Sequence, residues 1–384
     1  MSEPVLFDMR PQHPGRALRQ KMEEKGWGPD ELAAITGLSA SMIYSLISCK
    51  TNIGPETAAR LAAAFGNAAE EWIKWDGLYR LSALEFDFTA DLSEVGKMAR
   101  LYKLAPIRTM QKRGWIANAT DAEQLEAELK KFFGVESLDG DVSFPVATRR
   151  TFRSVNLNPA EKAWCFRARQ LAASIPIPGT FDPKMLGQTE KKLRRLAAYR
   201  KLADRVPEVL MDSGIRFVVV EPIPGVTIDG AAFWLDSEPV IAMSLRHDRI
   251  DGFWFTLMHE FAHIRNGDAS VDSDLIDGIK GITITLVEDE AERLANEAAA
   301  DALIPSAEMQ SFVNRVGPMY PRDRIIQFAH KVKIHPGIIV GQLQNRNEVG
   351  YSVLRDLLVK IRDVVISVAY TDGWKQSIAP AIMR

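Results

Sequence analysis

Two histidines four residues apart, with a glutamate directly after the first, constrain this chain more than any other feature of its sequence. The pentapeptide HEFAH at residues 259–263 ends an apolar stretch, residues 254–263, that is compatible with a helix. On a helix the two imidazoles lie one turn apart and point the same way, so both can bind one Zn²⁺ ion. Glu260 would lie beside the metal, where a carboxylate can take a proton from bound water. The segment therefore predicts a helix that binds one zinc ion per chain. The alternative is a pair of core histidines whose ring nitrogens form hydrogen bonds within the protein.

A zinc site of this kind needs a third protein ligand and an open fourth position for water. The next helix is acidic and is expected to begin near Val287, and one of its faces carries Glu288, Glu292, Ala295 and Ala299. The small alanines would let this helix pack closely on the histidine helix. This arrangement favours Glu292 as the third ligand, with Glu288 as the second choice, and an ordinary solvated helix is the alternative.

Three β-rich runs precede the histidine helix. Residues 215–220 form a continuous apolar run typical of a buried strand, and residues 231–235 and 239–244 are predicted strands around the turn at 236–238. With the helices, this pattern predicts a mainly α protein in which the zinc segment is a small α+β, zincin-like domain with a short β-sheet.

The first 82 residues predict five helices. A helix over residues 16–25 is followed by one that begins at Pro29, and the turn at 36–38 separates it from a helix that Ser39 caps and that ends near Ser48. Two short helices joined by a three-residue turn containing glycine are typical of a helix-turn-helix. The last two helices are expected at residues 55–66 and 69–81.

In a helix-turn-helix, the N-terminal residues of the second helix meet base edges in the major groove. The residues expected to do so, with two that follow the helix and could reach phosphates, are Ser39, Ser41, Met42, Tyr44, Ser45, Lys50 and Asn52. Residues 1–82 carry 9 basic and 10 acidic residues, so no basic excess indicates nucleic acid. The alternative is a small helical bundle that does not bind DNA.

The formal net charge of −2 hides an uneven distribution of charge. Residues 83–205 carry 22 basic and 15 acidic residues, whereas residues 206–384 carry 17 and 25. The side chains that supply much of the positive excess are Arg149, Arg150, Arg153, Lys191, Lys192, Arg194, Arg195, Arg200 and Lys201. This surface, within residues 149–205, is either a solvated helical face or a second nucleic-acid surface.

Composition and length bound the organisation of the chain. The 384 residues exceed one ordinary core, two cysteines cannot build a disulfide scaffold, and neither a secretory signal nor a run of 18 apolar residues is present. A cytoplasmic protein without membrane contact is therefore expected. Its predicted parts are a DNA-binding domain at 1–82, a basic helical linker at 83–157, a zinc domain at 158–355 and a C-terminal extension of unknown role at 356–384.

Helices are also predicted between and after these features. They are expected over residues 93–111, 121–133, 158–174 and 182–204, with a capping box at 120–123 opening the second. Residues 364–370 are expected to form a terminal strand or helix.

Several short motifs in residues 11–82 form one set. They are His13-Pro14-Gly15-Arg16-Ala17-Leu18, Glu31-Leu32-Ala33, Ile43, Ile53-Gly54-Pro55-Glu56-Thr57-Ala58, Trp72 and Tyr79-Arg80-Leu81. This set resembles the HigA antitoxin branch of the Xre/Cro helix-turn-helix family, whose usual acidic residue after the final tyrosine is Arg80 in this chain. The resemblance implies a homodimeric repressor that binds a palindromic operator.

A second set of motifs surrounds the histidine helix. It consists of Asp251-Gly252-Phe253-Trp254-Phe255-Thr256 before the pentapeptide, Glu292-Arg293-Leu294-Ala295-Asn296 with Ala299, Leu303-Ile304-Pro305, and the tail Ile334-His335-Pro336-Gly337-Ile338-Ile339-Val340-Gly341-Gln342-Leu343-Gln344. Over about residues 160–355 this set resembles the ImmA/IrrE zinc metallopeptidase family, and its tail resembles the end of HigA-fused members. The resemblance implies that His259, His263 and Glu292 are zinc ligands and that Glu260 is the general base. The chain departs from the family at Leu294, often a second Glu, and at Ala298, usually Phe.

Together the two resemblances imply a DNA-binding transcriptional regulator whose zinc peptidase domain cleaves the chain itself or a partner repressor in response to a signal. The alternative is a HigA-type antitoxin that represses its own operon and neutralises a toxin, with a non-catalytic or sensory zinc domain. The expected partners are double-stranded operator DNA and a toxin or repressor protein. His335, directly before Pro336, is a weaker catalytic candidate that could stabilise an oxyanion; a helix cap is the alternative.

Overall fold

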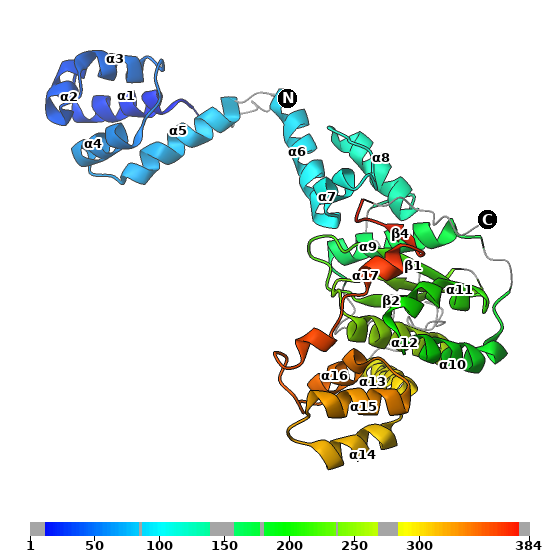
Figure 1. Ribbon diagram of the computed structural model, residues 1–384. Helices are drawn as coiled ribbons and strands as arrows, with labels where there is room; N and C mark the ends of the chain where they lie inside the picture. Colours follow the sequence, from blue (N-terminus) through cyan, green and yellow to red (C-terminus); the bar gives the residue numbers. More distant parts are fainter. Residues whose placement is uncertain are drawn as a thin grey trace. The chain divides into compact units, whose positions relative to one another are not determined.

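The computed structural model describes residues 12–83, 87–138, 157–176, 180–235, 237–267 and 283–375. Two compact units divide the chain, Met1–Lys97 and Met98–Arg384 (Figure 1).

Five helices form the first unit. They are α1 (Pro14–Lys25), α2 (Pro29–Thr36), α3 (Ala40–Ile47), α4 (Pro55–Phe65) and α5 (Ala69–Ala83). Their bounds agree with the predicted ones to within two residues. Gly37 ends α2 in the left-handed region at φ +66°, and Ser39 caps α3 because its Oγ accepts the amide of Met42 at 3.2 Å. Leu32, Ile43 and Trp72 are fully buried, so one side chain from each of three helices meets in the core.

A buried carboxylate holds the segment after α3 against α5. Asp76 on α5 is 2% exposed and accepts the backbone amide of Ile53 at 3.0 Å. Arg80, one turn further, pairs with the same carboxylate at 3.0 Å. The residue at which the chain departs from the HigA pattern therefore neutralises a buried charge.

The second unit is built on a four-stranded mixed sheet. The strands are β1 (Arg216–Val220), β2 (Gly230–Leu235), β3 (Glu238–Met243) and β4 (Tyr370–Asp372), in the order β2-β3-β1-β4. β1 pairs in parallel with β3 and with β4, whereas β2 and β3 form an antiparallel hairpin. The three strands predicted from the sequence are present, and the segment predicted as a terminal strand or helix forms both α17 (Arg362–Ile366) and β4.

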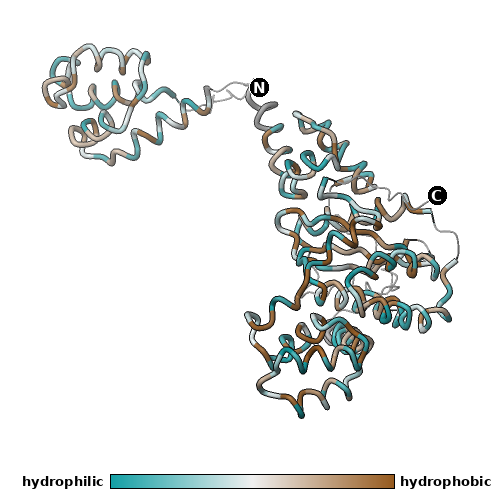
Figure 2. Tube along the Cα trace, in the orientation of Figure 1, coloured by the Kyte–Doolittle hydropathy of each residue, from teal (hydrophilic) through white to brown (hydrophobic). Residues whose placement is uncertain are grey.

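Helices cover both faces of this sheet, and β1 is accordingly apolar from Phe217 to Val220. Phe217 and Val219 of β1 belong to the core on one face, and Val218 and Val220 to the core on the other. This alternation is the two-residue period of a strand buried on both sides. Figure 2 shows the apolar residues concentrated along the strands.

One face carries α7 (Ile107–Lys112), α8 (Ala122–Phe133) and α9 (Pro159–Ala173). The helices of the other face are α10 (Leu186–Leu196), α11 (Val206–Met211), α12 (Ile250–Asn266), α13 (Thr283–Leu303), α14 (Ser306–Val316), α15 (Arg322–Val332) and α16 (Pro336–Asn345). Among the described residues, no helix has the length and apolarity that crossing a lipid bilayer requires.

Two predicted helices are interrupted. The helix expected over residues 93–111 is split into α6 (Asp87–Leu104) and α7, because Pro106 between them has no amide and restricts the residue before it. The helix expected over residues 182–204 consists of a 3-10 turn (Pro183–Met185), α10 and a second 3-10 turn (Arg200–Arg205). Asp121, rather than the predicted box from residue 120, caps α8 by accepting the amide of Gln124 at 2.8 Å.

Part of the predicted linker belongs to the core of the second unit. Leu101, Met110 and Leu125 are fully buried together with Trp164 of α9, whose Nε1 donates to the carbonyl of Val220 at 2.9 Å. Residues 101–138 are therefore a helical layer over one face of the sheet.

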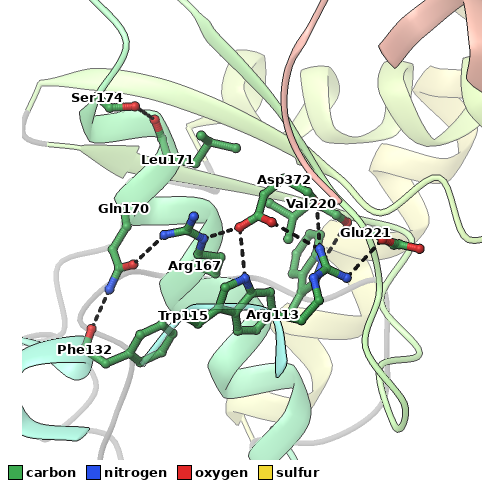
Figure 3. Close-up of polar contacts among 11 residues, drawn as sticks. Arg113, Trp115, Phe132, Arg167, Gln170, Leu171, Ser174, Val220, Glu221 and Asp372 are labelled. Atoms are coloured by element: carbon green, nitrogen blue, oxygen red, sulfur yellow. Dashed lines mark hydrogen bonds and ion pairs between the residues drawn. The ribbon is translucent and has the colours of Figure 1, made fainter. Parts of the chain in front are cut away.

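A charged cluster fastens β4 to that layer (Figure 3). The Asp372 carboxylate accepts Trp115 Nε1 at 2.9 Å and Arg113 Nη2 at 3.2 Å, and it also pairs with Arg167. Arg113 pairs in turn with Glu221, which follows β1, at 3.1 Å. We call these five residues the Asp372 cluster. It joins four chain segments at the carboxyl ends of β1 and β4.

Candidate functional sites

The predicted histidine helix is α12. Its apolar face packs into the core of the second unit, and this packing fixes the position of the helix. Gly267 ends the helix in the left-handed region at φ +74°, and Phe253, Leu257 and Phe261 are almost completely buried against the sheet and the neighbouring helices. His259 and His263 lie on the buried side and are each 1% exposed. Burial of two imidazoles is unfavourable unless their polar nitrogens have a partner.

The structure brings the three predicted metal ligands together. The Nε2 atoms of His259 and His263 face each other at 3.0 Å. On α13, Glu292 places its Oε2 atom 3.4 Å from Nε2 of His259 and its Oε1 atom 3.4 Å from Nε2 of His263. Ala295 and Ala299, predicted to allow close approach of the two helices, are completely buried.

The spacing of these atoms fits a zinc ion. Zinc bonds of about 2.0–2.1 Å in a tetrahedron separate the ligand atoms by about 3.3–3.4 Å. The two nitrogen–oxygen separations of 3.4 Å match this value, and the nitrogen–nitrogen separation of 3.0 Å is shorter. Two imidazoles and one carboxylate are also the ligand set of one class of catalytic zinc sites, with the fourth position left for water. His259, His263 and Glu292 could therefore hold zinc.

Glu260 lies beside the cluster in a fully buried position. It is 1% exposed, and neither carboxylate oxygen has a hydrogen-bond partner of ordinary geometry among the described residues. Burial raises the pKa of Glu260, and Glu292 adds to this effect, while the two histidines and the backbone amide of Ala232 oppose it. A carboxyl group whose pKa is raised holds a proton more readily than an exposed glutamate does.

The environment of Glu292 has the opposite net effect. Burial alone would raise the pKa of Glu292, but its contacts with His259 and His263 outweigh burial and lower it. Glu292 therefore remains an anion, as a metal ligand must. Glu288, the second choice, lies on α13 with its side chain outside the described residues. Leu294 is 43% exposed, so this departure from the family pattern concerns the surface of α13.

His335 is the N-cap of α16. Its Nδ1 accepts the backbone amide of Gly337 at 3.1 Å, and burial lowers the pKa of the imidazole. This arrangement is the helix cap that was the alternative to an oxyanion role.

The residues predicted to contact DNA lie on and just after α3. Ser39, Ser41, Tyr44, Lys50 and Asn52 are exposed, and Met42 and Ser45 are half-buried. Tyr44 is 51% exposed, although large aromatic side chains are usually buried. The oxygen of Ser39 is engaged by the helix cap and lies 3.0 Å from the Ser41 hydroxyl.

Two of the basic side chains of the predicted positive surface, Arg200 and Lys192, lie beside an acidic residue within the second unit. Arg200 pairs with both oxygens of Asp363, and Arg194 donates to the carbonyl of Val332 at 3.0 Å. Lys192 lies 4.0 Å from Asp212. Arg149, Arg150 and Arg153 lie outside the described residues.

One residue close to the site was missed by the sequence reasoning. Gly230, the first residue of β2, lies directly against Glu260. A glycine at the start of a predicted strand can indicate that another group approaches the backbone closely. This pattern in the sequence could have identified Gly230.

The comparisons with known proteins concern the first unit. A helix-turn-helix family model matches residues 18–72, which contain α2, the turn and α3. A HigA-family addiction module antidote protein from Coxiella burnetii is similar over 22% of this chain and 94% of its own, with 23% identity and a TM-score of 0.21. The antitoxin HigA of Pseudomonas aeruginosa with the higBA promoter is similar over 22% of this chain and 89% of its own, with 27% identity and a TM-score of 0.20. No curated protein matches the chain.

Proposed function

We propose that this protein is a DNA-binding transcriptional regulator whose second unit is a zinc peptidase that cleaves the chain itself or a partner repressor. The main support for peptidase activity is that His259, His263 and Glu292 lie together, with the buried Glu260 beside them. The resemblance of residues 160–355 to the ImmA/IrrE metallopeptidases supports the same function.

Each residue of the site has a role in peptide hydrolysis. The Nε2 atoms of His259 and His263 and the Glu292 carboxylate would hold the zinc ion. As a Lewis acid, the ion would activate water and polarise the peptide carbonyl. A Glu260 oxygen takes a proton from the attacking water as the new carbon–oxygen bond forms. Glu260 then gives this proton to the amide nitrogen as the carbon–nitrogen bond breaks. Glu260 is buried directly beside the metal ligands, where its carboxyl group can hold the proton between the two steps.

The edge of the sheet supports a peptide as the substrate class. β2 is an outer strand, and among the strands that the structure describes it pairs only with β3. An extended peptide can add to such an edge through backbone hydrogen bonds. Gly230 at the start of β2 lies against Glu260, so a strand added to this edge would run past the candidate metal site.

The first unit would bind double-stranded operator DNA. In this proposal α3 enters the major groove, Ser41 and Tyr44 meet base edges, and Lys50 and Asn52 contact phosphates. The exposure of these four side chains supports the assignment. Two copies of the chain would bind a palindromic site, since a dimer reads two half-sites related by its symmetry.

The decisive experiment follows the mass of the purified chain. Wild-type protein is incubated with Zn²⁺, with and without double-stranded DNA from its own promoter region and a companion repressor, beside the Glu260→Gln variant. Shortening of the chain or the repressor in the wild type alone supports the proposal. If the chain binds one zinc ion but neither protein is cleaved under any inducing condition, the proposal of peptidase activity is wrong.

A HigA-type antitoxin is the second candidate. The helix-turn-helix match and the HigA resemblance of residues 11–82 favour it. This function predicts that wild type and Glu260→Gln repress the promoter equally and neutralise a co-expressed toxin equally. A difference between the two proteins in either assay contradicts a non-catalytic zinc domain.

A further inference from the structure

The backbone of β2 leaves no room for a side chain at Gly230. A Cβ atom built there would lie 2.6 Å from Cγ2 of Thr256, 2.9 Å from Cγ of Glu260 and 2.9 Å from its Oε1. Non-bonded carbon atoms normally stay about 3.5–4.0 Å apart. The volume that a side chain would fill is therefore occupied by Glu260 and by Thr256, which lies one turn before it on α12.

The strand at this point is held along its β3 side by backbone pairing and by side-chain hydrogen bonds. Gly230 pairs with Met243 of β3, and the carbonyl of Asp229 accepts the amide of Ser244 at 2.9 Å. The Asp229 carboxylate also forms two hydrogen bonds with Arg246, at 3.0 and 3.1 Å. Because β2 is fixed in this way, a larger residue at position 230 would displace side chains of α12 rather than the strand.

No hydrogen bond of ordinary geometry from the described part of the chain fixes the Glu260 side chain, although the backbone amide of Ala232 lies close enough to stabilise its charge. Its carboxylate is buried, and neither oxygen has a partner of ordinary geometry among the described residues. Packing against the bare Cα of Gly230 is therefore a principal restraint on where the carboxylate lies.

We infer that Gly230 is a positioning residue that sets the place of the Glu260 carboxylate beside His259 and His263. The inference rests on the proposed function, in which Glu260 moves the proton. It adds a steric requirement at position 230 that a metal-binding motif on α12 does not contain.

A double-mutant cycle without metal tests the contact itself. The cycle is run on the full chain in a Thr256→Ser background, which removes the Cγ2 methyl and leaves Glu260 as the colliding group. Gly230→Ala should lower the midpoint of thermal unfolding by about 5 °C, since overpacking destabilises a core. With Glu260→Ala added, the same substitution should cost less than half as much. An equal cost in both backgrounds overturns the inference.

A matched control is available on α12. A Cβ added at Gly252 meets nothing within 4 Å. Gly252→Ala should therefore not lower the unfolding midpoint, because an alanine with free space is favoured over glycine in a helix.

A spectroscopic test separates positioning from stability. Co²⁺ replaces Zn²⁺, and the pH at which the visible Co²⁺ spectrum changes reports the bound water and the group that shares its proton. The Gly230→Ala variant should bind Co²⁺ as tightly as the protein with Gly230. Its midpoint pH for the spectral change should shift towards that of the Glu260→Gln variant. A midpoint that stays with the parent, while Glu260→Gln shifts it, overturns the positioning role. If the parent binds no Co²⁺, the proposed function fails, and the metal-free cycle still decides the contact of Gly230 with Glu260.

Discussion

His335 begins α16 with the same hydrogen bond that His13 makes at the start of α1. In each case ring Nδ1 accepts the amide of the glycine two residues later, at 2.9 Å for Gly15 and 3.1 Å for Gly337. The backbone angles of the two histidines are also nearly the same, with φ/ψ of −57°/134° and −60°/134°. The tripeptide His-Pro-Gly therefore builds one type of helix start in both units, with proline at the first helical position.

The cap of α16 should weaken in acid. Burial lowers the pKa of His335 below 6.5, so the unfolded chain takes a proton at a higher pH than the folded chain. The stability from this group is thus complete above pH 6.5 and is lost as the pH falls from 6.5 through the folded pKa. Hydrogen exchange of α16, corrected for intrinsic rates, should show less protection at pH 5 than at pH 7.5.

The matched variant for this prediction is His335→Asn. Asparagine keeps a side-chain acceptor at the N-cap and does not titrate, so α16 should lose less protection in acid than in the wild type. His335→Ala should lower stability by about 1 kcal/mol even at pH 7.5. Equal acid sensitivity of the wild type and the asparagine variant contradicts the assignment.

The glycines of the two tripeptides should not tolerate a methyl group. A Cβ at Gly15 would lie 1.9 Å from the carbonyl oxygen of Leu46, and one at Gly337 would lie 2.4 Å from that of Leu357. Gly15→Ala and Gly337→Ala should each destabilise by about 1–3 kcal/mol, because backbone atoms must move. Chemical denaturation measures the loss. Gly187→Ala in α10, where an added Cβ meets nothing within 4 Å, is the control and should show none.

Local patterns predicted the helices of the first unit and the three strands before α12. The signals there were short in range: Gly37 ends a helix, Ser39 caps the next, and an apolar run forms β1. The pairing of β1 with β4 could not be predicted, because Val219 and its partner Thr371 are far apart in the sequence. The Asp372 cluster depends on the same distant pairing, so no local pattern singles out Arg113 or Arg167.

The candidate metal site was predictable for a related reason. The two histidines lie on one helix, where a spacing of four fixes their geometry, and Glu292 follows from the face that it shares with Ala295 and Ala299. Gly230 reaches the site through a strand that packs across α12. Helical spacing contains no information about such a contact.

Removal of the third ligand should abolish tight zinc binding. Glu292→Ala leaves two imidazoles and should lower zinc affinity at least about 100-fold, measured by competition with a chromophoric chelator. Glu297→Ala, on the same helix with a 62% exposed side chain paired to Arg293, should bind zinc as the wild type does. If Glu292→Ala retains zinc while Glu288→Ala loses it, Glu288 is the ligand.

The Asp372 cluster should contribute strongly to the stability of the second unit. Asp372→Ala would remove the carboxylate that pairs with Arg167, which is 19% exposed, while Arg113 would keep its ion pair with Glu221. The expected loss is about 3 kcal/mol in the free energy of unfolding, since breaking a mostly buried ion pair leaves an uncompensated charge. Asp363→Ala is the control, because its 69% exposed carboxylate pairs with Arg200 near the surface and should contribute less than about 1 kcal/mol. Equal losses for the two variants rule out this role.

Two substitutions after and within α3 should separate the two kinds of DNA contact. Lys50→Ala removes the proposed phosphate contact, so it should weaken binding to all duplexes and reduce the slope of log affinity against log salt by about one. Tyr44→Ala removes the proposed contact with base edges, so it should weaken binding to the operator by about 1–3 kcal/mol and leave the salt slope unchanged. Fluorescence anisotropy with operator and unrelated duplexes over a salt series measures both effects. Tyr199→Ala in the second unit, where the side chain is 69% exposed, is the control. A Tyr44→Ala variant that still distinguishes the two duplexes as the wild type does would exclude Tyr44 from sequence recognition.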